Sequence, residues 1–507
     1  MRPRILNHHL LSRHHGLYAR RFGSQPSCTQ KISLILSIKA PKRTVIEELN
    51  KHLANSTRKP IDSWEEKGPG CQHGAAIFAS RDFATWLDDE SFMSGLLKTL
   101  SKPSASGHVS PEDVSVLCAV ADGLTPKRLF GEPQAGFSIL YGSANNILPG
   151  LWDSSDFGSN VDQDREASVS FLSKPLPRDT RPLEIALPLA NTVFQNGRRS
   201  TLFASRWQRD HNGSIARTLM QEKRAQTIRP HANVAGHAAP ILPLLPLTPP
   251  RKVVAGLGNI VRQVEVDGSP TPASKELEGL IPKVFDHRSK QDASYSPGPI
   301  GVWCWVIPPQ VVASQNLLDL EVFQTESSQS EAELSLNSMS VFSELISSGC
   351  RLHKILSGGG GWGLKQGLLS LDPETNHSPP DQDDIEMFIK AFQERDSPNP
   401  SEGLVTPGSY LMFCIEPHCT EKEVGSSQQM IPTTVLGVAP NNDQELNPGG
   451  LSDKIEVVDD HFGVVSKTGL FLKALPHMTG INNANNSAEQ PRPFTTKVDF
   501  PGASFVL

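Results

Sequence analysis

A glycine-rich segment comes closer than any other part of this sequence to a known chemical motif. Gly358, Gly360 and Gly363 match the G-x-G-x-x-G spacing of loops whose backbone amides bind phosphate at the start of a helix. The related P-loop pattern fails, because Leu364 stands where that motif needs lysine and Lys365 follows one residue too late. The tract is therefore interpreted either as a phosphate or anion site or, more simply, as a flexible connector.

The residues just before the tract bear on this choice. A dinucleotide-binding loop follows a strand, whereas the apolar spacing at 341–346 predicts a helix upstream and no clean strand. His353 and Lys354 could bind an anion or transfer a proton, and a plain surface position is the simpler expectation for both. If the tract is a flexible connector, it is expected to let Trp362 pack against a neighbouring element.

Soft metal ligands gather in one short segment further on. Cys414, His418 and Cys419 lie close together in the sequence. A structural zinc site needs four ligands, usually as two spaced pairs, and only a distant pair, Cys71 and His73, could complete the set. We therefore expect no metal, with Cys414 in a buried strand and Cys419 in a loop.

Signatures of the common hydrolases and metalloenzymes are missing. The patterns G-x-S-x-G, H-E-x-x-H and Cys-x-x-Cys do not occur. Seven cysteines, an odd number at irregular spacing in a long chain, indicate reduced thiols rather than a disulfide framework. The sequence thus predicts no catalytic residue and no cofactor.

The elements that would position such residues are clearest in the first half. Apolar runs at 75–79 and 114–121 flank an amphipathic segment between Trp86 and Leu100. This order predicts a βαβ unit in a sheet that is covered on both faces. A helix is also predicted at 44–53, and strands are predicted at 31–39, 136–141, 168–172, 183–187 and 200–207.

A proline-rich segment at 240–250 predicts a linker between two halves. Beyond it, a polar Ser/Glu-rich stretch at 325–335 predicts an insertion. The predicted helices are 272–281, 341–346 and 381–395, and the predicted strands are 252–256, 260–266, 301–307, 410–415, 433–438, 455–458 and 469–472. The fold class is therefore α/β with α+β elements, a two-part sheet-and-helix architecture with long Pro/Gly-rich loops.

The first residues predict a location rather than a chemistry. The leader is rich in arginine, and no acidic residue precedes Glu47. Such a segment is typical of a mitochondrial transit peptide, here 1–30 with a processing step after Phe22, and it predicts a matrix protein. The leader also contains His8, His9, His14 and His15, to which we assign no role.

Composition narrows the choice of partners. The formal net charge of −6 gives no general reason to bind nucleic acid. No apolar run approaches the roughly 20 residues of a membrane-spanning helix. The classes of partner that remain are a small metabolite and another protein.

Two separated segments resemble one known family. The run Ala75-Ala76-Ile77-Phe78-Ala79-Ser80-Arg81-Asp82-Phe83, with the helix and the strand that follow it, is similar to the opening of FIST sensory domains. After the linker, Gly258-Asn259-Ile260-Val261 and the turn at Asp267-Gly268, leading to a helix from about Ser274, resemble the start of the FIST C-terminal part. The turn Ala121-Asp122-Gly123-Leu124 departs from the small-residue, Cys-containing turn of that family.

The resemblance implies a division into a FIST N-like domain at 31–240 and a FIST C-like domain at 251–507, the latter with the Ser/Glu-rich insertion and the Gly tract (351–373). FIST domains are intracellular sensory or ligand-binding modules, so it also implies binding rather than catalysis. The leading hypothesis is a mitochondrial FIST-like ligand-binding or scaffolding protein. The alternatives are an enzyme that binds a phosphate-bearing substrate through the Gly tract, and a structural subunit of a mitochondrial assembly.

Overall fold

The computed structural model describes the chain in segments. Most of the expected leader, the expected helix at 381–395 and the residues Cys71, Gly360, Trp362, Gly363 and Cys419 lie outside them. The described residues are 29–55, 72–101, 113–126, 131–153, 167–176, 181–210, 213–230, 237–293, 295–315, 317, 320–325, 329–358, 367–377, 404–418, 433–440, 455–475 and 495–507.

The first sheet is built around the predicted βαβ unit. Strands β2 (His73–Ser80) and β3 (Asp113–Ala121) are parallel neighbours, and helix α3 (Glu90–Leu100) lies between them in sequence. The sheet order is β10 (Ile215–Glu222), β9 (Leu202–Arg209), β3, β2, β4 (Gly136–Ser143), β1 (Gln30–Ile35) and β22 (Glu456–Asp459). The prediction of a βαβ unit is confirmed.

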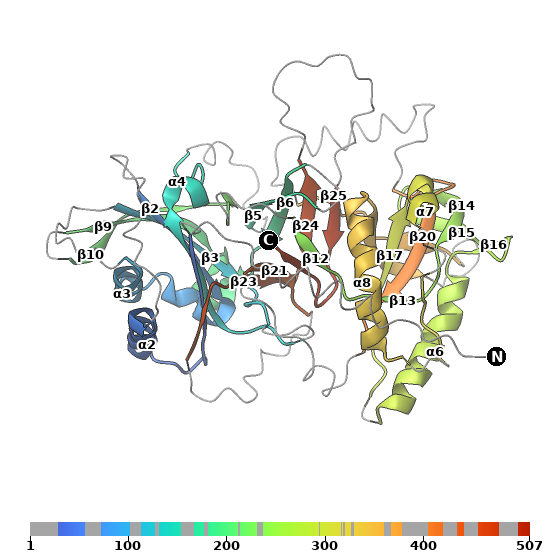
Figure 1. The fold of residues 1–507 in the computed structure, drawn as a ribbon, viewed down its shortest axis with the longest axis horizontal. Coiled ribbons are helices and arrows are strands. Elements are labelled where there is room, and N and C mark those ends of the chain that lie inside the picture. Colours follow the sequence, from blue (N-terminus) through green and yellow to red (C-terminus); the bar gives the residue numbers. More distant parts are fainter. Residues whose placement is uncertain are drawn as a thin grey trace, which may run out of the picture.

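Both faces of this sheet are covered, as the apolar strands require. Ile77 packs in a core with helices α2 (Lys42–Asn55) and α3, which lie on one face (Figure 1). Its neighbour Phe78 points to the other face and packs against Phe171 and Phe462. Asp89 begins α3, where its side chain accepts a hydrogen bond from the amide of Phe92 at 3.0 Å.

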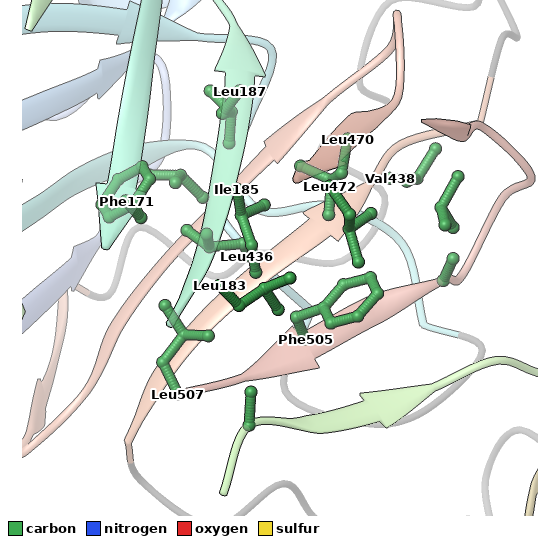
Figure 2. Packing of buried hydrophobic residues seen from close by; sticks show 14 of the residues in the cluster. Phe171, Leu183, Ile185, Leu187, Leu436, Val438, Leu470, Leu472, Phe505 and Leu507 are labelled. Carbon is green, nitrogen blue, oxygen red and sulfur yellow. The ribbon is translucent and has the colours of Figure 1, made fainter. Parts of the chain in front are cut away.

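Two smaller sheets form the centre of the molecule. One has the order β11 (Ala225–Ile228), β5 (Ser168–Ser173), β6 (Leu183–Pro188), β24 (Leu470–Ala474) and β25 (Thr495–Val498). The other has the order β12 (Ala239–Ile241), β26 (Ser504–Val506), β21 (Thr434–Val438) and β23 (Phe462–Ser466). Figure 2 shows their shared core, in which Ile185, Leu472, Leu436 and Phe505 point toward one another.

A small barrel forms the other end of the molecule (Figure 1). Its strands follow the order β20 (Tyr410–Ile415), β14 (Arg251–Leu257), β15 (Ile260–Val266), β19 (Leu369–Leu371), β18 (Arg351–Gly358) and β17 (Val302–Ile307), and pairing of β17 with β20 closes the ring. Strands β13 (Leu245–Pro246) and β16 (Ser269–Pro272) pair at its margins. Helices α6 (Lys275–Gln291), α7 (Pro309–Gln315) and α8 (Glu331–Ser347) lie beside it.

The remaining described elements are short: η2 (Arg81–Trp86), α4 (Ala144–Ile147), α5 (Val193–Asn196), β7 (Asn191–Thr192) and β8 (Arg198–Ser200). Among the helices that the structure describes, none is long and apolar enough to cross a membrane. The mixed α/β class predicted from the sequence is confirmed.

The proline-rich segment is not an exposed linker, contrary to the prediction. It forms β12 and β13, and Leu242, Leu244 and Leu247 between and after them are buried. The leucines drive this segment into the core, while the prolines occupy short strands that need few donated hydrogen bonds. Strands from the end of the chain also pair with β1 and β6, so the sheets cross the expected boundary at 240–251.

The predicted Ser/Glu-rich insertion at 325–335 contains the start of α8. Ser330 and Glu333 form a reciprocal capping box, with the Glu333 amide donating to Ser330 Oγ at 3.2 Å. Glu331 is buried and accepts two hydrogen bonds from Arg288 of α6, at 3.0 and 2.8 Å. This buried pair links α6 to α8, so Ser330, Glu331 and Glu333 have structural partners.

Candidate functional site

Strand β18 precedes the Gly tract, and the prediction that no strand would stand there is wrong. Helix α8 ends at Ser347, and Gly349, with φ of 78°, reverses the chain so that β18 begins at Arg351. The amide of Gly349 donates to the Ile346 carbonyl at 3.0 Å, a C-terminal turn that glycine accommodates without strain. The predicted helix at 341–346 lies within α8, and the strand between this helix and the tract was missed.

The described residues after the tract form a strand. Gly358 pairs with Leu369 at the end of β18, and β18 and β19 run antiparallel. A phosphate loop of the dinucleotide-binding or P-loop type leads from a strand into a helix N-terminus. The described flanks are instead those of a β-hairpin, which disfavours the phosphate interpretation of Gly358, Gly360 and Gly363.

His353 and Lys354 do not share one face of β18. His353 is 2 % exposed and points into the barrel core, which corrects the expected surface position. Its Nδ1 donates to the Asp372 carbonyl at 2.8 Å, while its Nε2 has no hydrogen-bond partner among the described residues. Burial lowers the pKa of His353 to about 4, so the ring is neutral near pH 7.

Lys354 points to the outside of the barrel wall. Its Nζ lies 5.5 Å from the ring centroid of Trp303, a cation–π contact. Trp303 Nε1 donates to the Asp499 carboxylate at 2.7 Å, and burial raises the pKa of that carboxyl group. Lys354 is therefore part of the junction between the barrel and the central sheets, and the structure does not bring it together with His353.

The soft-ligand residues also occupy structural positions. Cys414 is buried in β20, as predicted, and His73 lies in the first sheet, stacked on Tyr141. Burial raises the pKa of the Cys118, Cys304, Cys350 and Cys414 thiols, which are therefore protonated near neutral pH. No group of three His, Cys, Asp or Glu side chains that could hold a metal occurs within the described ranges.

A polar cluster that the sequence did not predict lies beneath the first sheet. Ser33 of β1 and Ser138 of β4 are register partners, and their hydroxyl oxygens are 3.1 Å apart. His461 Nδ1 lies 2.8 Å from Ser33 Oγ, and His461 Nε2 lies 3.4 Å from the Thr125 hydroxyl. We call Ser33, Ser138, Thr125 and His461 the His461 network.

Strand β23 holds this network in place. The amide of Gly463 donates to Ser138 Oγ at 2.8 Å. A β-carbon at Gly463 would lie 1.8 Å from Thr125 Oγ1 and 2.7 Å from His461 Cε1, so only glycine permits this approach. Asp460, with φ of 54°, makes the turn by which the chain passes from β22 in the first sheet to β23 in the central one.

The network lies near the carboxyl ends of the parallel strands β2 and β3. Thr125 lies four positions after Ala121, the last residue of β3, and Ser138 pairs with Phe78, close to the end of β2. In α/β sheets, ligands bind outside the carboxyl ends of the parallel strands. This edge is therefore where the sheet architecture favours a ligand.

A buried lysine lies beside the network. Lys31 lies on the same face of β1 as Ser33 and is 7 % exposed. Burial lowers the pKa of Lys31 to about 8, with the Asp460 carboxylate acting against this shift and the charge of Lys174 adding to it. Burial and the charge of Lys31 lower the pKa of His461 to about 4. Near pH 7, Lys31 is therefore mostly charged and His461 is neutral.

One side of the site is accessible to solvent. Lys31, Ser33 and Ser138 are buried and form its floor. His461 and Lys174 are partly exposed, and Asp460 is exposed. The site thus combines buried polar groups with an open rim, a pattern typical of small-molecule sites.

The network could have been found in part from the sequence. In the segment that becomes β1, Lys31 and Ser33 alternate with Ile32 and Leu34, which places two polar residues on one buried face. Nothing local indicates that His461 is their partner, because it lies 428 positions after Ser33.

Comparison with known protein families, curated proteins and solved structures finds no match to this chain. The FIST resemblance of the two segments therefore stays a prediction. Their local structure consists of β2 and α3 in the first segment, and of β15, a turn with positive φ at Asp267 and Gly268, and α6 in the second.

Proposed function

We propose that this protein is a mitochondrial, FIST-like module that binds a small polar metabolite at the His461 network and catalyses no reaction. The observation that supports binding is the convergence of polar residues from β1, β4, the segment after β3 and the β22–β23 turn on one place. The surrounding layer is apolar, since Phe78, Phe171 and Phe462 pack beside it. Polar groups concentrated in an apolar layer fix the orientation of a ligand.

The geometry of Ser33 and His461 favours binding over nucleophilic catalysis. Ser33 is 1 % exposed, and its hydroxyl also donates to the His461 carbonyl at 3.2 Å. A catalytic histidine is normally oriented by a third group, often a carboxylate, whereas His461 Nε2 faces the Thr125 hydroxyl. A buried serine held in this way is poorly placed to attack a substrate.

Thermal denaturation across a library of polar metabolites tests the proposal. We expect at least one compound to raise the melting temperature saturably, since a ligand that binds only the native state stabilises it. The effect should vanish in Ser33→Ala and His461→Asn and persist in Ser340→Ala, a control on the exposed face of α8. Circular dichroism checks that each variant is folded. A library without any saturable stabiliser contradicts the proposal.

The location is tested separately. The acid-free leader motivates the proposal of import and cleavage after Phe22. N-terminal sequencing of the protein from purified mitochondria should find Gly23 at the start. An intact Met1 in that preparation would falsify this part.

A further inference from the structure

We propose that the segment 381–395 of this chain docks, as an amphipathic helix, on an exposed apolar patch of the barrel wall. The patch, here called the barrel patch, consists of Val254 and Leu257 of β14, Ile260 of β15 and Leu356 of β18. The segment lies outside the described residues, and its sequence predicts a helix. The inference concerns a surface separate from the His461 network and does not depend on the function proposed there.

Neighbouring strands bring the barrel patch together. Leu257 and Ile260 are register partners, and Ile260 lies opposite Ser370 of β19. Ser370 in turn lies opposite Ser357, which follows Leu356 at the bulge of β18. Leu257 is 77 % exposed and Leu356 is 58 % exposed. Apolar side chains that are exposed on adjacent strands, rather than scattered singly, mark an interaction surface.

The two ends of the segment lie on either side of the patch. Before it, the amide of Asp372 donates to the Lys354 carbonyl of β18 at 2.8 Å. After it, the amide of Val405 donates to the Gly258 carbonyl at 3.1 Å, at the tip of the hairpin formed by β14 and β15. The chain between these anchors therefore connects β18 at one margin of the patch to β14 and β15 at the other.

The segment is long enough to lie across the patch. A helix over 381–395 would be about 22 Å long. The strands that carry or separate the patch residues, β18, β19, β15 and β14, are together about 14 Å across from the first strand axis to the last. One helix can therefore contact both Leu356 and Leu257.

The apolar spacing of the segment suits this face. Four of its apolar residues recur at the spacing that places them on one side of a helix: Ile385, Phe388, Ile389 and Phe392. A helix with such a face is stable in water mainly when that face is packed against another apolar surface. The barrel patch offers a surface of this kind at the place where the chain must pass.

The charges are complementary as well. Lys252 and Arg262 are exposed on the same two strands as the patch, and neither forms an ion pair with a described residue. The start of the segment is acidic, with carboxylates at Asp381, Asp383, Asp384 and Glu386. Opposite charges at the rim of an apolar contact fix its register and orientation. Charge, apolar spacing and chain connection thus agree on one occupant.

Limited trypsin digestion of the full-length protein tests the inference through the rate of cleavage after Lys390 and Arg395. We expect this rate to rise roughly tenfold or more in the double variant Leu257→Ser, Leu356→Ser. Cleavage of a docked segment follows the population of its undocked form, and the variant loses apolar contacts that favour docking. Phe194→Ser is the matched control, since Phe194 is 97 % exposed in α5, outside the barrel, and the rate should stay unchanged.

A reciprocal variant shows whether the two surfaces contact each other. Phe388→Ser, Phe392→Ser should accelerate cleavage as the patch variant does, and combining the two should add little, because both remove the same contact. Circular dichroism and thermal melting check that the exposed substitutions leave the fold intact. Equal cleavage rates in the wild type and the patch variant, or fully additive effects, would overturn the inference.

Cross-linking identifies the occupant directly. The starting protein carries Cys28→Ser, Cys71→Ser and Cys419→Ser, so that the cysteines left are buried. Leu257→Cys with Phe388→Cys should then be joined within one chain by a short bifunctional maleimide, whereas Phe194→Cys with Phe388→Cys should not. Cross-links between chains, together with a dimer that the patch variant dissociates, would assign the patch to a second copy. No cross-link would leave it to another protein, and either result contradicts the inference.

Discussion

His353 and Lys354 are neighbours in β18 but face opposite sides of the barrel wall. Their cross-strand partners in β17 show this, because Cys304 opposite His353 lies in the barrel core and Trp303 opposite Lys354 packs against the central sheets. The two side chains therefore cannot contact the same ligand. Their separation turns the predicted anion-binding pair into two structural residues with different electrostatic surroundings.

Acid should destabilise the protein through its histidines. In the unfolded chain a histidine takes up a proton near pH 6.5, whereas the pKa of both His353 and His461 is about 4 in the fold. Stability is then fully present above pH 6.5 and is lost as pH falls toward 4, by at most about 3 kcal/mol for each histidine. Urea unfolding between pH 7 and 4.5 measures this loss.

The matched variants for this experiment are His353→Gln and His237→Gln. His353→Gln should reduce the pH dependence because it removes one titrating group, while His237→Gln, at an exposed position, should leave it unchanged. Identical pH slopes for His353→Gln and the wild type would show that His353 does not contribute to acid lability.

Gly463→Ala should destabilise the fold and disrupt the His461 network. The added methyl group would occupy the place of the Thr125 hydroxyl, and forced repacking of this kind typically costs about 1–3 kcal/mol. Thr125→Ala in the same chain should restore part of the loss, which a double-mutant cycle in urea measures. Gly279→Ala is the control, since nothing lies within 4 Å of its position in α6, and it should be neutral or stabilising.

Glu331→Gln should be among the most damaging polar substitutions. It leaves the buried Arg288 charge without its carboxylate, and breaking such a pair typically costs about 3–5 kcal/mol. Glu47→Gln removes an exposed carboxylate paired with Arg43 and should change stability by roughly 0.5 kcal/mol or less. Chemical denaturation of both variants decides the point, and equal effects would contradict the structural role of the buried pair.

The Gly tract should not bind nucleotides. Its described flanks are antiparallel strands, which lack the helix N-terminus that a phosphate loop uses. Calorimetry with ATP, NAD and coenzyme A should therefore give no saturable heat, and the double variant Gly360→Ala, Gly363→Ala should behave as the wild type does. Micromolar binding that the double variant abolishes would restore the enzyme alternative.

Local sequence patterns predicted only those parts of the fold that are determined by residues close together in the sequence. The apolar runs around Ile77 and Cys118 sufficed for the βαβ unit, because burial on both faces leaves a direct trace in the sequence. The start of α8 could have been read from Ser330 and Glu333, whose spacing is that of a capping box, but the polar composition of the stretch concealed it.

The closure of the barrel and the His461 network were beyond such reasoning. Pairing of β17 with β20 depends on register between distant segments, and no local pattern specifies it. The candidate site is harder still to predict, because single residues such as Thr125 and His461 become chemical neighbours only through the arrangement of two sheets.

The pairing of β1 with β22 also constrains the order in which the chain can fold. Ser33 meets His461 only after the ribosome has reached a residue 428 positions later in the chain, which takes roughly 20–90 s at ordinary elongation rates. Until then β1 is an unpaired sheet edge, a template for association with other chains. The yield of folded protein should therefore depend on protecting the free edge of β1 from other chains, by slow synthesis or by a chaperone, until β22 has been made and pairs with it.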